Sequence, residues 1–437
     1  MRINRLKIQN FKGFKEFALD LQPHFNVLVG ENGSGKTSVL DALAVALGLW
    51  HKHIPGHGWR NILPEEIHVE PRQAGDRITF EPVLPVRIEA SGSIMDAATN
   101  VTWTRMIREG GTRTTNAEAN EAEKAIAVLI EMAKQDKTVL PVLAYYGAGR
   151  AWLPTNRRPP STLPMLGQKS SRFDAYHNCL DTRIRDQDLN HWFLLETAAR
   201  VQNGGDRPGF QAVKAAVLKC IPGADALRYD ADRKEIVLSI GGHEQSFYNL
   251  SAGQRMMLAL VADIAIKAIT LNSYLFSSRM LTSTDPISLL EMTTGMVLID
   301  EVDVHLHPTW QRRVVNDLKT VFKSIQFVCT THSPQVIGEV PRDQVMILDA
   351  NGPHAPSVAY GADSNWILEH VLGTPVRSAE IEQLIRLVED ALEEGNLDEA
   401  REKLSDLRQR MGAEDGEIVR LESSVSSMES SSSSEDD

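Results

Sequence analysis

The segment from Gly30 to Thr37 constrains the fold of this chain more than any other part of the sequence. It reads GENGSGKT and fits the phosphate-binding pattern GxxxxGK[ST], with an apolar run at 25–29 before it and a helical pattern at 38–43 after it. The glycines let main-chain N–H groups converge on phosphate oxygens, Lys36 reaches the outer phosphates, and the Thr37 hydroxyl suits Mg²⁺. The candidate nucleotide-binding residues here are Gly30, Glu31, Asn32, Gly33, Ser34, Gly35, Lys36, Thr37 and Ser38.

A second anion-binding element follows much later in the chain. Residues 250–255 read LSAGQR, open a long apolar helical pattern, and resemble the LSGGQ signature motif. At a helix N-terminus, the Ser251 hydroxyl and the N–H groups around Gly253 form an anion site separate from the first. Ser251, Gly253 and Gln254 are therefore further candidate nucleotide ligands. A chain with two such half-sites is expected to pair with a second copy.

Two buried-strand patterns end in residues suited to nucleotide chemistry. Residues 296–301 (MVLIDE) end in Asp300 and Glu301, as in a Walker B motif. We expect Asp300 to hold Mg²⁺ together with Thr37, and Glu301 to orient and deprotonate the attacking water. Residues 325–332 (IQFVCTTH) deliver His332 at the end of a strand, which matches a switch histidine beside the γ-phosphate.

In this order, the four motifs resemble the head of an ABC-type ATPase, in the branch that contains the SMC, RecF and OLD proteins. Residues 3–14 are similar to the first strand and turn of that branch, where a basic residue at the position of Lys12 approaches the nucleotide. Residues 300–308 (DEVDVHLHP) are similar to the Walker B and D-loop of compact prokaryotic members, which carries over Asp303.

The resemblance implies an α/β fold of the P-loop NTPase class, an ABC-type ATPase head whose mixed sheet is joined by an antiparallel β subdomain. It also implies ATP and Mg²⁺ as cofactors. Two chains are expected to sandwich two ATP molecules, in a homodimer or a higher even oligomer. An inserted helical lobe and a C-terminal helical hairpin complete the expected architecture.

Five segments are expected along the chain. They are ATPase lobe I with the P-loop and β subdomain (1–146), an inserted basic and helical segment (147–233), ATPase lobe II with the signature, Walker B and switch histidine (234–350), a helical hairpin (351–422) and a disordered serine-rich, acidic tail (423–437). The local patterns predict strands over 77–90, 101–109 and 139–146, helices over 117–135 and 186–201, and a β-hairpin over 234–248. Because no heptad repeat is sustained, no long coiled-coil arm is expected.

The formal charge of −12 is concentrated at the C-terminal end. Eighteen acidic and six basic residues lie between Ala379 and Asp437, so the first 378 residues are neutral overall. Apolar residues from Ile381 to Leu392 share one helical face, Gly395 suits a C-terminal cap, and Asn396 with Glu399 forms a capping box for a second helix. Because one helical pair cannot bury both of its faces, it is expected to pack on the head or to present a groove to a partner.

Composition indicates a cytoplasmic protein that does not enter a membrane. No apolar run approaches the ~18 residues of a membrane span, and the N-terminus has a strand pattern in place of a signal peptide. The three cysteines, Cys179, Cys220 and Cys329, have no CxxC spacing. A reducing compartment is therefore expected, without a disulfide framework or structural zinc.

A basic segment from Gly147 to Arg185 opposes the acidic end of the chain. Its cations oppose two carboxylates (Asp174 and Asp181), with aromatic residues interleaved, which suits a phosphate backbone and exposed bases as well as an ordinary solvated loop. The residues are Arg150, Arg157, Arg158, Lys169, Arg172, Arg183 and Arg185, with Trp152, Phe173 and Tyr176. Arg150 follows a core strand at the ligand-facing end, so contact with nucleotide or a neighbouring subunit is the alternative for it.

Two smaller questions stay open at this level. His305 and His307 lie near two carboxylates, which raises a transition-metal site as an alternative, although Walker B already assigns those carboxylates to Mg²⁺. The glutamine that transporter-type heads use as a Q-loop has no diagnostic setting here; Gln73 and Gln168 are the candidates.

These features predict an ATP-driven switch that controls a separate effector. Residues 145–150 (YYGAGR), the Arg172 and Tyr176 pair and the acidic hairpin resemble compact bacterial defence ATPases of the Septu and retron-associated type, which partner with an HNH nuclease. One alternative is a RecF-like ATPase that binds DNA directly in repair. Another is a scaffold that binds ATP with little turnover, against which Glu301 argues.

Overall fold

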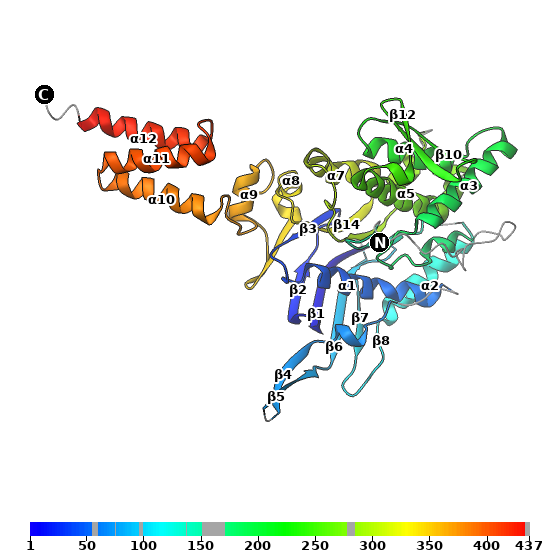
Figure 1. Cartoon of the computed structure of the whole chain (residues 1–437). Helices are drawn as coiled ribbons and strands as arrows, with labels where there is room; N and C mark the ends of the chain where they lie inside the picture. The colour runs from blue at the N-terminus through cyan, green and yellow to red at the C-terminus, as the bar shows by residue number, and fades with distance from the viewer. Residues whose placement is uncertain are drawn as a thin grey trace. The chain divides into compact units, whose positions relative to one another are not determined.

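The computed structural model describes residues 1–54, 60–74, 76–95, 99–136, 138–150, 171–277 and 285–432. The chain divides into two compact units, Met1–Ile367 and Leu368–Asp437 (Figure 1). The first unit contains the P-loop, the signature, Walker B and the switch histidine. The second contains the acidic helices.

A five-stranded antiparallel sheet includes the N-terminal strand, in the order β2-β1-β6-β7-β8. Its strands are β1 (Arg2–Phe11), β2 (Phe14–Asp20), β6 (Val86–Ser93), β7 (Val101–Ile107) and β8 (Thr115–Glu118). The single strand expected over 77–90 is wrong: only its last residues belong to β6, and its first residues form part of a separate ribbon. Pro82 ends the ribbon strand and Pro85 lies just before β6, and neither has the N–H group that a continuous ladder needs.

A six-stranded sheet forms the centre of the first unit, in the order β16-β15-β3-β14-β13-β9. Its strands are β3 (Phe25–Val29), β9 (Val142–Tyr146), β13 (Gly295–Ile299), β14 (Ile325–Thr330), β15 (Val345–Asp349) and β16 (Gly352–His354). All pairs are parallel except β15 with β16. β3, β9, β13 and β14 are buried throughout, as parallel strands covered on both faces are, which explains their continuous apolar runs. The expected α/β fold, a mixed sheet with an antiparallel β subdomain, is confirmed.

Helix α1 (Lys36–Leu47) lies between the two sheets. It contacts β1, β6 and β7 of the antiparallel sheet, and β13 and β14 of the central sheet. Its residues from Val39 to Leu47 are all buried, which accounts for an apolar sequence on every side of the helix. The helix that follows the P-loop is therefore held rigidly on both faces.

The remaining helices of the first unit are α2 (Asn120–Lys134), α3 (Asp186–Asn203), α4 (Pro208–Cys220), α5 (Ala252–Asn272), α6 (Ser288–Met292), α7 (Pro308–Val321) and α8 (Pro334–Ile337), and α9 (Ser364–His370) spans the boundary of the units. The segment Ala252–Phe276, which begins with α5, is long and apolar enough to cross a membrane, but 72% of its most apolar window is buried inside the fold. It is a core helix.

Two small antiparallel sheets complete the first unit. One has three strands, β10 (Ala224–Asp230), β11 (Glu235–Ile240) and β12 (His243–Ser246), and includes the hairpin predicted over 234–248. The other is a two-stranded ribbon of β4 (Val69–Ala74) and β5 (Arg77–Pro82).

The second unit contains three packed helices. α10 (Ala379–Glu393) and α11 (Leu397–Met411) are the two predicted helices, and the Asn396 side chain accepts a hydrogen bond from the Glu399 N–H, as its capping role requires. α12 (Gly416–Ser432) packs against them. It includes ten residues that the sequence assigns to a disordered tail, because Ile418, Leu421 and Val425 recur on one helical face and are buried in this small core. The last residues of that tail, 433–437, lie outside the described residues.

Candidate nucleotide-binding and hydrolysis site

The P-loop connects the end of β3 to the start of α1. Gly35 caps α1 with a φ of 94°, which L side chains rarely adopt, and a Cβ there would lie 2.3 Å from the Phe14 ring. Glu31, Asn32 and Gly33 are exposed at the tip of the loop. Only glycine at position 35 allows the loop to turn into the helix in this way.

The Lys36 amine lies inside the loop. Its Nζ donates hydrogen bonds of 2.8 Å to the carbonyl oxygens of Gly30 and Glu31. Burial lowers the pKa of Lys36, against the opposing effect of the Asp300 and Glu301 carboxylates. The Ser34 hydroxyl in the same loop is buried and has no hydrogen-bond partner among the described residues. A cation and an unused donor in one loop fit a phosphate group.

The Asp300 carboxylate, directly after β13, lies beside the P-loop helix. The Thr37 hydroxyl is 3.1 Å from its Oδ2, and the Thr330 hydroxyl of β14 donates a 2.6 Å hydrogen bond to its Oδ1. Thr37 and Asp300, predicted from motifs far apart in sequence, are thus brought together. A hydroxyl and a carboxylate are the hard oxygen ligands that Mg²⁺ prefers.

Glu301 is held by its main chain. Its φ is 49°, its N–H donates to the Thr330 hydroxyl at 2.7 Å, and its carbonyl oxygen accepts from Arg150 at 3.1 Å. A left-handed conformation costs a non-glycine residue about 1–3 kcal/mol, so these contacts stabilise a strained turn. The half-buried side chain of Glu301 follows Asp300 at the carboxyl edge of the sheet.

Arg150 is buried beneath this turn, with 2% of its surface exposed. Its guanidinium donates to the main-chain carbonyl oxygens of Asp300 (2.7 Å), Glu301 (3.1 Å) and Gly147 (3.2 Å). Burial lowers its pKa to about 10, which still leaves it charged at neutral pH. The guanidinium is thus occupied by main-chain carbonyl oxygens of the same chain, in place of the expected contact with nucleotide or a neighbouring subunit. Arg150 positions the main chain of the Walker B turn.

Lys12, in the turn between β1 and β2, belongs to a charged cluster with Asp41 of α1. Its Nζ pairs with Asp41 and lies 3.6 Å from Glu66. Asp41 also accepts a 3.1 Å hydrogen bond from the Tyr145 hydroxyl. Lys12 is therefore anchored to the helix that begins at the P-loop.

The signature motif forms the N-terminal turn of α5. Ser251 is an exposed N-cap: its hydroxyl accepts from the Gln254 N–H at 3.2 Å, and its own N–H donates to the Gln254 side chain at 3.0 Å. Gly253 is buried, and a Cβ there would lie 2.6 Å from the His305 carbonyl oxygen. The signature turn therefore packs closely on the loop that follows Walker B in the same chain.

The D-loop and switch residues follow β13 and β14. The Thr331 hydroxyl donates to the Asp303 carboxylate, and the next residue, His332, is exposed at the end of β14. His307 caps α7 by accepting from the Thr309 N–H. In the described part of the chain, no group of three or more His, Cys, Asp or Glu side chains is arranged to hold a metal ion, so the alternative transition-metal site has no support.

The basic segment is only partly described. Arg172 makes internal contacts, donating at 2.7 Å to the carbonyl oxygens of Ala133 and Leu271, and Tyr176 is buried. These two residues are not an exposed nucleic-acid surface, contrary to that interpretation of the segment. Trp152, Arg157, Arg158 and Lys169 lie outside the described residues, as does Gln168. The other Q-loop candidate, Gln73, lies in the exposed ribbon opposite Ile78.

The sequence did not single out two residues of this site. Thr330 contacts both Asp300 and Glu301, and Asp41 connects Lys12 to Tyr145. Each residue has a signal in the sequence: Asp41 is a carboxylate among the apolar residues from Val39 to Leu47, and Thr330 ends a strand directly before Thr331 and His332. Neither signal says which groups the side chain meets.

Comparison with known proteins agrees with this geometry. Residues 2–352 match the family model described as "RecF/RecN/SMC N terminal domain". The chain is 24% identical over 498 residues to the retron Ec83 probable ATPase of Escherichia coli, covering 96% of this chain and 86% of that protein. It is 29% identical over 386 residues to the Septu protein PtuA of Bacillus thuringiensis, covering 85% and 83%.

Among solved structures, the chain is similar to the SMC head domain from Thermotoga maritima, with a TM-score of 0.42 and 14% identity. The match covers 79% of this chain and 94% of that one.

Proposed function

Because this chain belongs to the RecF/RecN/SMC N-terminal domain family of ABC-type ATPases, we propose that it is an ATP-hydrolysing switch in which two copies enclose two ATP molecules. One observation carries the proposal most directly. The Thr37 hydroxyl of the P-loop helix lies 3.1 Å from the Asp300 carboxylate of Walker B, as a shared Mg²⁺–nucleotide site requires.

The P-loop binds the phosphates of ATP in this proposal. N–H groups from Gly30 to Ser38 surround the phosphate oxygens, and the Lys36 amine exchanges its two carbonyl partners for phosphate oxygens of higher negative charge. Ser34 offers its unused hydroxyl. Lys12, anchored to α1 through Asp41, adds positive charge near the entrance of the loop.

Walker B supplies the hydrolytic chemistry. Thr37 and Asp300 would hold Mg²⁺, which would neutralise charge on the phosphates. Glu301 accepts a proton from the attacking water. The water oxygen bonds to the γ-phosphorus as the bond between that phosphorus and the bridging oxygen of ADP breaks. His332 is exposed at the end of β14. In this proposal its side chain contacts the γ-phosphate and loses that contact when the phosphate leaves.

The second copy completes each site. Ser251 is exposed at the N-terminus of α5, a helix of 21 residues whose dipole and free N–H groups attract an anion. Ser251, Gly253 and Gln254 of one copy are proposed to contact the ATP held by the P-loop of the other. Gly253 packs closely on the His305 carbonyl oxygen. In this proposal, a movement of the loop after Walker B therefore also moves the N-terminal turn of α5.

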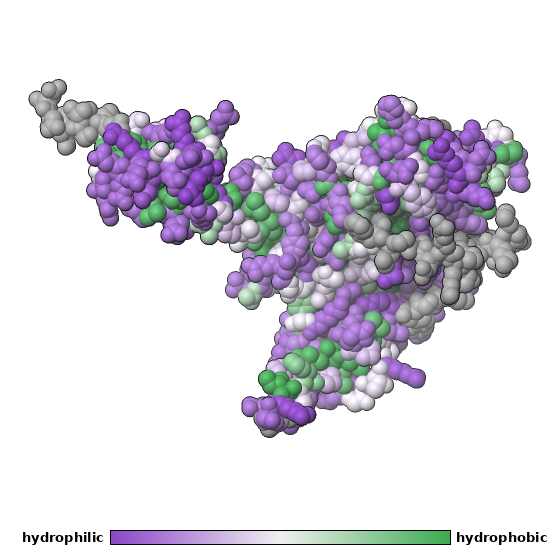
Figure 2. Space-filling view, in the orientation of Figure 1, coloured by the Kyte–Doolittle hydropathy of each residue, from purple (hydrophilic) through white to green (hydrophobic). Residues whose placement is uncertain are grey.

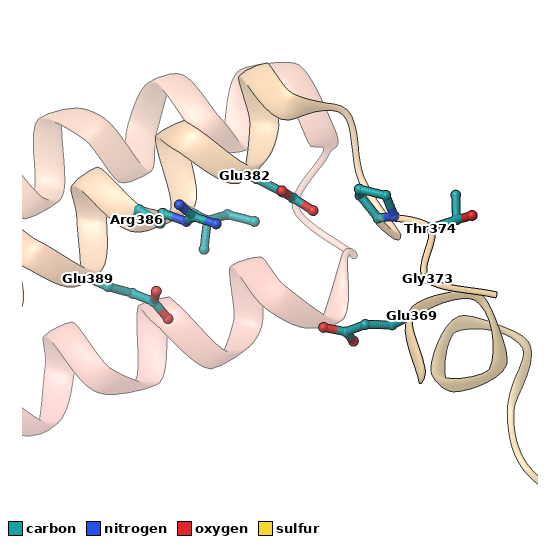
Figure 3. A pocket seen from close by; sticks show the side chains of 8 residues that line it. Glu369, Gly373, Thr374, Glu382, Arg386 and Glu389 are labelled. Carbon is teal, nitrogen blue, oxygen red and sulfur yellow. The ribbon is translucent and has the colours of Figure 1, made fainter. Parts of the chain in front are cut away.

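The output is proposed to be control of a separate nuclease effector of the HNH type in bacterial anti-phage defence. The similarity to retron and Septu proteins over most of the chain supports this proposal. In the second unit, a pocket of about 390 Å³ lies between residues 369–375 and α10. Figure 3 shows Glu369, Glu382, Arg386 and Glu389 around it, a surface suited to a basic segment of the effector.

A direct test uses the wild-type chain. Phosphate release with ATP and Mg²⁺, and light scattering with and without nucleotide, are expected to show turnover together with ATP-dependent doubling of mass. Binding of ATP without turnover would favour the scaffold alternative. Strong, salt-sensitive DNA binding by the isolated chain would favour a RecF-like role in repair.

A further inference from the structure

The β4–β5 ribbon exposes apolar side chains to an unusual degree. Ile78 is 68% exposed, Phe80 67% and Val69 45%. In the described part of the chain, neither strand pairs with another sheet. Figure 2 shows hydrophobic residues gathered over this ribbon. Isolated two-stranded ribbons are marginally stable in water, so a ribbon with these side chains gains by adding strands.

The two faces of the ribbon differ. The pairing of Pro71 with Phe80 and of Gln73 with Ile78 places Ile78, Phe80 and Val69 on one face. The opposite face carries alternating charges, with Arg72 3.0 Å from Glu81. Five charged residues lie between Val69 and Pro82, two basic and three acidic, which does not suit a phosphate backbone. A protein partner fits this surface better than nucleic acid does.

The two edges of the ribbon also differ. Proline cannot donate to a ladder, so Pro71 must belong to a pair that is not hydrogen-bonded, and its outward edge lacks an N–H group. Its partner Phe80 then points its own N–H and C=O groups outward from β5, as does Ile78 two residues away. The β5 edge from Arg77 to Glu81 contains no proline. β4 is therefore a protected edge, whereas β5 is open to pairing.

We propose that the β5 edge pairs with β5 of a second copy, antiparallel and centred on Thr79. This register joins the outward-facing groups of Ile78 to those of Phe80 in the other copy. It also places Arg77 opposite Glu81 of the other copy, twice by symmetry. Apolar pairs and opposite charges are the cross-strand pairs that stabilise a sheet, so the segment RITFE is complementary to itself.

This contact is separate from the ATP sandwich and does not need nucleotide. Five residues on each side make a small interface, which acts together with another contact more than alone. Because β5 carries none of the nucleotide motifs, the two contacts use different parts of the chain.

Cross-linking through a single cysteine tests the register. In this register, Thr79 of one copy lies opposite Thr79 of the other in a close pair that is not hydrogen-bonded. Thr79→Cys chains are therefore expected to form a disulfide on mild oxidation without ATP. Arg72→Cys, opposite Thr79 on β4 and exposed, is the matched control and lies on the outer strand. We expect Thr79→Cys to cross-link about tenfold faster or more. The natural cysteines are buried, which keeps the background low.

Charge exchange then tests the proposed pairs. In the Thr79→Cys background, Arg77→Glu places like charges together, and so does Glu81→Arg, so each variant alone should cross-link slowly. A mixture of the two restores both opposite-charge pairs in the heterodimer and should recover the fast rate. Equal cross-linking of the Thr79→Cys and Arg72→Cys proteins, or no recovery in the mixture, would overturn the proposal. Circular dichroism melting confirms that each variant is folded.

Discussion

The guanidinium of Arg150 donates a 2.7 Å hydrogen bond to the main-chain carbonyl oxygen of Asp300. A second bond reaches the carbonyl of Glu301, whose φ of 49° is strained. One buried side chain thus fixes the main chain of two adjacent carboxylates from behind, without occupying the space in which nucleotide is expected.

Arg150→Lys is therefore expected to lower the rate of ATP hydrolysis by about 10- to 100-fold. A lysine ammonium lacks the planar fork that donates to both carbonyl oxygens, so the main chain at Glu301 is expected to shift and to move the carboxylate out of position. The affinity for ATP should change little, since Lys36 and the P-loop are untouched. Steady-state kinetics with a separate binding measurement check this, at a temperature well below the melting point of the variant. A loss of affinity equal to the loss of rate would contradict a positioning role.

The nucleotide motifs could be predicted because each is continuous in sequence. Gly30 to Thr37 and Met296 to Glu301 carry their strand, turn and functional side chains within a few residues. The role of Arg150 could not be predicted in this way. It depends on β9 lying beside β13 in parallel register, with Tyr146 opposite Ile299, a pairing between segments about 150 residues apart.

Composition misled in two places. The serine-rich stretch after Leu421 predicts disorder, but Val425 continues the apolar face of Ile418 and Leu421, and all three side chains are buried in the core shared with α10 and α11. Arg172 was assigned to a basic surface by its neighbours in sequence. In the fold it satisfies main-chain carbonyls at the end of α2, which no local pattern reveals.

Glu301→Gln is expected to reduce turnover by about 10²-fold or more, because the amide cannot accept the proton of the attacking water. ATP and Mg²⁺ binding should persist, so the closed dimer should accumulate. Phosphate release and light scattering in ATP measure the two effects. Glu339→Gln, an exposed carboxylate of the same unit, is the control. Turnover near the wild-type rate would remove Glu301 from this role.

Thr330→Val should also slow hydrolysis while leaving the shape of the side chain nearly unchanged. It removes the hydroxyl that donates to Asp300 at 2.6 Å and accepts from the Glu301 N–H, so a half-buried carboxylate and an N–H group lose partners. Thr330→Ser keeps the hydroxyl and should retain most of the activity. If serine and valine are equally damaging, packing rather than hydrogen bonding explains the effect.

Two inactive variants test whether sites are completed between copies. Lys36→Ala should lose ATP binding, because the phosphates lose a charge-assisted partner, whereas Ser251→Arg should bind ATP but fail to close. In a mixed dimer, the intact P-loop of one chain meets the intact signature of the other, and one working site results. Recovered phosphate release is the expected outcome. If heterodimers form but release no phosphate, either the sites are not shared between chains or hydrolysis requires both sites of the dimer to be intact.

Removal of the acidic helices tests whether ATP hydrolysis and effector binding reside in different parts of the chain. Truncation before Ala379 should leave ATP binding and hydrolysis intact, because every nucleotide motif lies upstream, and should abolish co-purification with the effector. The alternative is that these helices cover apolar surface of the first unit. Val388, Leu404 and Leu407 belong to the core that α10, α11 and α12 form within the second unit, so we expect thermal melting of the truncated chain to match that of the full chain.

A point variant sharpens the same prediction. Glu382→Lys reverses a charge at the pocket of the second unit without touching its core, and should weaken binding of a basic effector segment. Glu393→Lys changes an exposed carboxylate on the same helix that does not line the pocket, and it should have little effect. Equal binding by both variants would move the docking site elsewhere on α10 to α12. Retained binding by a stable, ATP-hydrolysing truncation would exclude the acidic helices altogether, because docking must then involve the first 378 residues.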